Sequence, residues 1–125
     1  MKLPICVKSS FLFFVPALGH IAAGSLAFGM TTAALGCVSV MNHAGVGGKT
    51  IQHVDRVMAH AVPAMYCLCF PTALTLGTTT YCGSLFMYGK HVRRKKYPEF
   101  QLCDSVFHAH LHALAALAMA AAAVC

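Results

Sequence analysis

The sequence carries little charge, and this shortage limits the kind of protein it can form. Only 10% of its 125 residues are charged and three are acidic, whereas 58% are hydrophobic and the mean hydropathy is +0.70. A soluble domain normally carries about a quarter charged residues. So few charges cannot give a globule of this size a polar surface, which excludes an ordinary soluble domain. We therefore expect most of the surface to face lipid.

The sequence also lacks any CxxC pair, although it contains seven cysteines. Most of these cysteines stand inside apolar runs. Cys67 and Cys69 are spaced so that they fall on different faces of a helix. This pattern favours small packing residues over disulfides or a cysteine-based zinc site.

Basic residues are scarce outside one short segment, HVRRKK at 91–96, which supplies much of the formal net charge of +6. The segment lies between apolar runs. A cation cluster in that position is typical of a loop that sets membrane topology, so we expect no nucleic-acid partner.

Three long apolar runs are present, and they predict an all-α membrane protein with three transmembrane helices in a single domain, residues 1–125. The first run covers about 11–41 and is too long for a signal peptide, so we expect a retained helix. The second, about 53–88, contains prolines that should kink it, and a fourth span within it remains an alternative. The third, about 104–125, is just long enough to cross a bilayer.

Three spans running up-down-up would leave most cations on one side of the membrane, with Lys49 and Arg56 on the other. The cations on the first side are Lys2, Lys8, Lys90, Arg93, Arg94, Lys95 and Lys96. The positive-inside rule then places the N-terminus on the matrix or cytoplasmic side.

His60 is the most suggestive residue of the second run, HVDRVMAHAVPAMYCLCFP at 53–71. Arg56 precedes it by one helical turn, so both side chains share a helix face. A histidine inside an apolar span, with a cation nearer the membrane surface, suits an axial haem ligand whose propionates meet that cation. The alternative is a histidine that bonds to a neighbouring helix.

With His60, and with His20 in the first run, the chain resembles the cytochrome b large anchor subunit of succinate dehydrogenase. The SxxHRxTG motif of that family corresponds to ALGHIAAG at 17–24, which keeps only His20 and Gly24 and lacks the serine and arginine that contact quinone. The haem-ligating histidine of the family follows about forty residues later, as His60 does here. Phe-Pro and Gly-Lys pairs then follow at 70–71 and 89–90.

This resemblance implies that His60 ligates a haem b together with a histidine of the small anchor subunit, and that Arg56 pairs with a propionate. His20 would lie near the cofactor site, and the chain would form part of the wall of the ubiquinone pocket. The loop at 90–96 would dock the iron–sulfur subunit. The chain would be a non-catalytic subunit of an oxidoreductase complex in the mitochondrial inner membrane. The alternative is a supernumerary structural subunit of another respiratory complex or of ATP synthase.

A weaker resemblance connects the chain to the seven-span ceramidase and progestin-receptor hydrolase superfamily. SVMNH at 39–43, Asp55 and HAHLH at 108–112 resemble the SxxxH, Asp and HxxxH elements of that superfamily. There the histidines hold zinc and activate water on a lipid amide. Three spans would place His43 and Asp55 on the opposite side from His108, whereas four would bring them to the same side. The alternative to a zinc site is that His108, His110 and His112 form a cluster at the membrane interface, at the start of the third span.

Overall fold

A computed structural model describes residues 4–96 and 106–124, and all regular structure in this part of the chain is helical, as predicted. Lys2 and residues 104 and 105 of the predicted third span lie outside the described residues. The elements in chain order are α1 Ile5–Ser10, η1 Phe11–Phe13, α2 Phe14–Ala22, α3 Leu26–His43, α4 Gly48–Cys69, α5 Ala73–Tyr88, η2 Gly89–Arg93, α6 Arg94–Lys96 and α7 Val106–Ala123.

The first apolar run folds as a helical hairpin. The elements α1, η1 and α2 follow one another directly, and α3 then packs back against them. The reversal occurs at residues 23–25, where Gly24 has a φ of +85° and the Ser25 N–H donates to the His20 carbonyl. Glycine adopts this left-handed conformation without the steric cost that a side chain would impose. The single helix predicted over 11–41 is therefore wrong.

The second run is also divided, at Phe70–Pro71–Thr72. Pro71 has no N–H to donate, and a residue before proline is disfavoured in the helical region; Phe70 has a φ of −130° and a ψ of 69°. Thr72 then caps α5 by accepting from the Thr75 N–H. Pro71 thus ends a helix instead of kinking one, and the predicted continuous span over 53–88 is wrong. Pro63 lies within α4.

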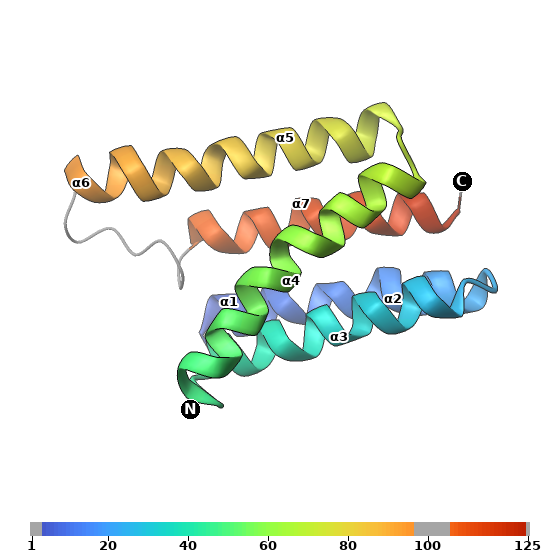
Figure 1. Ribbon diagram of the computed structural model, residues 1–125, viewed down its shortest axis with the longest axis horizontal. Coiled ribbons are helices and arrows are strands. Elements are labelled where there is room, and N and C mark those ends of the chain that lie inside the picture. Colours follow the sequence, from blue (N-terminus) through green and yellow to red (C-terminus); the bar gives the residue numbers. More distant parts are fainter. Residues whose placement is uncertain (1–3, 97–105, 125) are drawn as a thin grey trace.

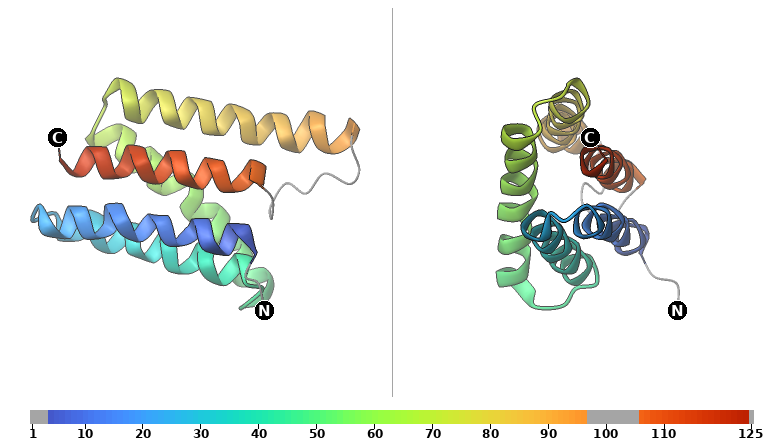
Figure 2. Two further views of the ribbon diagram at one scale, coloured as in Figure 1. Left: turned by 180° about the vertical axis from the view of Figure 1, so that it is seen from behind. Right: turned by 90° about the vertical axis from the view of Figure 1, so that its right-hand side faces the viewer.

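The two reversals produce five helical rods in the described residues (Figure 1). The last helix, α7, packs against α1, α2 and α5. The α4 helix runs across the other rods and connects the N-terminal hairpin to α5, as the end-on view in Figure 2 shows. The C-terminal helix therefore lies between the first rod and α5.

The core lies where η1, α3, α4 and α7 meet, and it combines large side chains with alanines. Its buried members are Phe13, Leu35, Val62, Tyr66, Ala116, Met119 and Ala122. Small residues bring the helices close together, because a Cβ at Gly19 would lie only 3.3 Å from the Cβ of Ala123. A buried hydrogen bond of 2.7 Å joins Thr32 Oγ1 to the Tyr66 hydroxyl and ties α3 to α4.

The outer surface is apolar. The side chains of Phe11, Val15 and Leu18 are 51%, 60% and 66% exposed along one face of the first rod. Within the described residues, two helical segments, Ile5–Ala22 and Val106–Ala123, are long and apolar enough to cross a membrane. The further predicted span and the orientation in the membrane remain predictions.

The connections alternate between two ends of the molecule. The turns at 23–25 and 70–72 lie at one end, and the starts of α1, α4 and α7 lie at the other, together with α6 (Figure 1). The cations of the described range all belong to segments at this second end, which we call the cationic end: Lys8, Lys49, Arg56, Lys90, Arg93, Arg94, Lys95 and Lys96. The prediction that Lys49 and Arg56 lie opposite the other cations is wrong, because each extra reversal returns the chain to this end.

The hydrogen bond between Thr32 and Tyr66 gives a test of the core. Replacing Tyr66 by phenylalanine leaves the buried Thr32 hydroxyl without this partner, so we expect a loss of about 1–2 kcal/mol in the free energy of unfolding. Denaturant unfolding in detergent micelles measures the loss. Tyr81→Phe is the matched control, because Tyr81 is 50% exposed. Equal stability of the two variants would contradict the structure.

Candidate metal centre

Three histidines meet at the cationic end. His43 is the last residue of α3, and His108 and His112 stand one turn apart on α7. One ring nitrogen from each lies within 4.8 Å of the corresponding nitrogens of the other two. The ring centroids are 5.1 Å apart for His43 and His108, 5.2 Å for His43 and His112, and 4.6 Å for His108 and His112. Side chains from two helices therefore gather around one point.

The cluster offers the donor type that zinc binds. Zinc binds histidine nitrogen at about 2.0–2.1 Å, so the nitrogens of a tetrahedral site lie roughly 3.3 Å apart. The 4.8 Å separation in the structure is wider, so the three rings would have to move closer together to hold the ion. His112 is buried, and His43 and His108 are partly buried. Three histidines with one position left open is the ligand set of catalytic zinc sites such as that of carbonic anhydrase.

Serines of α1 and α3 surround His112. Ser9 Oγ lies 2.8 Å from His112 Nδ1, and Ser10 Oγ lies 3.5 Å from the same atom. Ser39, the first residue of the SxxxH element, lies behind them, with its hydroxyl 2.8 Å from that of Ser10. The Phe13 ring packs edge-on against His112 at 5.3 Å. The imidazole is thus enclosed and held in one orientation.

Asp55, in the second turn of α4, is held close to this cluster. Asn42 Nδ2, one residue before His43, donates to Asp55 Oδ2 at 2.6 Å. Partial burial raises the pKa of the Asp55 carboxyl, whereas the Asn42 hydrogen bond and the nearby His43 and Arg56 lower it. Asp55 is thus attached to the end of α3, beside the residue that precedes His43.

A short glycine-rich connection brings Asp55 back to His43. Gly45, Gly47 and Gly48 all have positive φ, and a Cβ at Gly47 would clash with the Ile51 side chain. The expectation that three spans separate His43 and Asp55 from His108 is wrong, because the turns at 23–25 and 70–72 bring the three segments to one end. The structure therefore brings the three elements that resemble the ceramidase and progestin-receptor superfamily to the same end of the molecule. These elements are SVMNH at 39–43, Asp55 and HAHLH at 108–112.

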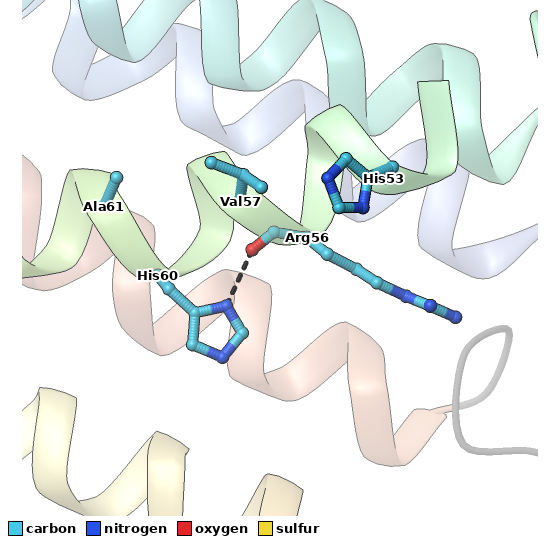
Figure 3. A pocket seen from close by; sticks show the side chains of 5 residues that line it. All are labelled: His53, Arg56, Val57, His60 and Ala61. Carbon is cyan, nitrogen blue, oxygen red and sulfur yellow. Dashed lines mark hydrogen bonds between the residues drawn. The ribbon is translucent and has the colours of Figure 1, made fainter. Parts of the chain in front are cut away.

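The position of His60 within an apolar run predicted a buried side chain, but the structure shows that His60 is exposed. It lies exposed on α4, and with His53, Arg56, Val57 and Ala61 it lines a shallow, open groove along one face of that helix (Figure 3). Its Nδ1 is 2.6 Å from the Arg56 carbonyl oxygen. The α4 helix buries the face that carries Val62. His60 lies two residues before Val62, so its side chain points to the opposite face of the helix.

His20 lies in the core, apart from the groove beside His60. Its side chain is 1% exposed, and its Nε2 is 3.3 Å from the carbonyl oxygen of Met119 on α7. The rings of Phe28, Tyr66 and Phe70 pack around it, with centroids 5.5, 5.4 and 5.8 Å away. His20 thus connects neighbouring helices, and the structure does not bring it together with His60 and Arg56. Its predicted cofactor role stays a prediction.

Ser9 and Ser10 are the residues of this centre that the sequence analysis did not identify. Two adjacent hydroxyls at the start of an apolar run are the only local sign of them. Their partner, His112, is 103 residues from Ser9 in the sequence. No periodicity within the N-terminal run indicates such a contact.

No protein-family model, curated protein or solved structure matches this chain. Both family resemblances therefore rest on the residues of this chain alone.

The histidine cluster predicts zinc binding at one equivalent per chain. We expect His112→Ala to abolish tight binding, because two histidines remain where three hold the ion. Metal analysis of the purified protein after dialysis, and absorption of the cobalt-substituted form, measure the loss. His110→Ala is the matched control, because His110 packs against Phe107 and Tyr81 on another face of α7. Equal zinc content in the two variants would contradict the site.

Proposed function

We propose that this chain is a membrane-embedded, zinc-dependent hydrolase of lipid amides, with His43, His108 and His112 as the metal ligands. The observation that carries the proposal is the convergence of these three histidines, from α3 and α7, to within 4.8 Å. Asp55 and Ser39, the remaining elements of the resemblance to the ceramidase and progestin-receptor superfamily, belong to the same end of the molecule.

Each polar group of the centre has a distinct part in this proposal. Zinc, when bound, supplies a water molecule of pKa about 7 and polarises a carbonyl. Asn42 holds Asp55 Oδ2, which leaves Oδ1 to accept a proton from the attacking water. Asp55 then returns that proton to the leaving amine as the amide C–N bond breaks. Water adds to the carbonyl carbon, so the products are a carboxylic acid and an amine.

A lipid substrate suits the surface around the centre. Large apolar side chains are exposed near the histidine-bearing ends of α3 and α7, among them Met41, Val46 and Val106, at 37%, 53% and 71% exposure. Acyl chains can lie along such a surface while the amide reaches the centre at the cationic end. The positive-inside rule places this end on the cytoplasmic or matrix side.

Hydrolysis by the zinc-loaded protein in lipid vesicles tests the proposal, with an N-acylated sphingoid base as substrate. We expect Asp55→Asn to retain zinc and to lose about 10²–10⁴-fold in rate, because an amide cannot accept the proton. Release of the fatty acid measures the rate, and Glu99→Gln makes the equivalent change at another acidic residue. Absence of hydrolysis in the zinc-loaded parent protein, or an unchanged rate in Asp55→Asn, would overturn the assignment.

The exposed histidine of α4 favours a second candidate, the membrane anchor of a succinate:ubiquinone oxidoreductase in the mitochondrial inner membrane. The bond from His60 Nδ1 to the Arg56 carbonyl orients the ring and leaves Nε2 as the ligating atom. A haem b in the groove beside His60 would take its other ligand from a partner anchor subunit. Arg56 lines the same groove and would meet a propionate. Ubiquinone would bind at the assembled complex, and the iron–sulfur subunit would dock on residues 90–96.

A reduced-minus-oxidised visible spectrum of the purified native complex tests this candidate. We expect a b-type band that disappears in His60→Ala, because the axial ligand is lost. His53→Ala is the control, since His53 lines the same groove. A native complex without a haem band, or a band that survives in His60→Ala, would rule out the anchor candidate.

A further inference from the structure

We infer that Ser9 is a positioning residue of the metal centre: its hydroxyl oxygen accepts the Nδ1 proton of His112 and thereby directs the Nε2 lone pair of His112 to the metal. This inference rests on the proposed zinc site. It adds a residue of α1 that belongs to neither the SxxxH nor the HxxxH element.

The assignment follows from the single proton on each serine hydroxyl. Ser9 Oγ lies 3.2 Å from the Cys6 carbonyl oxygen, which can only accept, so this hydrogen bond needs the serine proton. The same oxygen lies 2.8 Å from His112 Nδ1. An imidazole nitrogen can either donate or accept, so both hydrogen bonds of Ser9 form together only when Nδ1 carries the hydrogen.

Ser10 reinforces the same arrangement. Its hydroxyl donates to the Cys6 carbonyl oxygen at 2.6 Å, and it then accepts from Ser39 Oγ at 2.8 Å. Ser10 Oγ also lies 3.5 Å from His112 Nδ1, again as an acceptor. His112 Nδ1 therefore faces two serine hydroxyls, and both of these donate their protons to the Cys6 carbonyl oxygen.

Because these side chains are buried, the position of the His112 proton decides which ring nitrogen is free to bind a metal. Ser9, Ser10 and His112 are 8%, 0% and 8% exposed, so water does not replace a lost partner readily. A neutral imidazole has one N–H and one lone pair. With the hydrogen on Nδ1, the lone pair is on Nε2. An outer hydrogen bond of this kind orients a ligating histidine and raises its basicity, and its loss typically costs 10–100-fold in metal affinity.

Zinc affinity of the purified full chain in detergent micelles tests the inference, by competition with a chromophoric chelator. We expect Ser9→Ala to bind zinc about 10–100-fold more weakly. Ser9→Thr keeps the hydroxyl and should restore most of the affinity. Ser84→Ala, at an exposed serine of α5, is the control for the loss of a hydroxyl as such.

Nitrogen NMR of the metal-free protein gives an independent readout, because the ring shifts distinguish the two tautomers of His112. We expect the Nδ1–H form in the parent protein and loss of that preference in Ser9→Ala. An Nε2–H form in the parent protein would overturn the inference even if Ser9→Ala does not fold. So would a Ser9→Ala variant that binds zinc as the parent does. A parent protein that binds no zinc would instead remove the proposed function, and the tautomer measurement would still decide whether Ser9 holds His112.

Discussion

The two reversals of apolar helix, at residues 23–25 and 70–72, are the constraint on which the rest of the structure depends. In apolar surroundings the backbone must satisfy its hydrogen bonds within helices, so the points where a helix ends decide which segments can meet. Gly24 supplies a left-handed residue, and Pro71 removes a donor. These two positions turn three apolar runs into five rods, and they bring the starts of α1, α4 and α7 to one end.

Polar contacts between the rods then select one packing among the many that apolar surfaces permit. Thr32 bonds to Tyr66, and the imidazole of His20 bonds to the Met119 carbonyl oxygen. The bond between Ser9 and His112 connects the first helix to the last. A buried polar group without a partner costs about 1–3 kcal/mol, so a shift in packing would lose several such contacts together. This explains why α7, although last in sequence, lies among the other helices.

The two candidate sites differ in whether they need a second protein chain to complete the set of metal ligands. The histidine cluster of α3 and α7 would draw its ligands from one chain, so the proposed zinc site would need no other subunit. His60 offers one nitrogen to the outside of α4 and needs a second chain to complete a haem site. In both places the Nδ1 atom is held by the chain's own oxygen, from Ser9 for His112 and from the Arg56 backbone for His60.

The sequence by itself determined the helical class, the apolar surface and the shared face of His108 and His112, because these follow from composition and from spacing within one helix. It did not determine where the apolar runs reverse, since one glycine and one proline carry that information. Only the tertiary structure decided that Ser9 meets His112 and that His60 faces outward. The physical reason is distance along the chain: hydrogen bonds across 103 residues and the choice of a buried helix face depend on how all the helices pack.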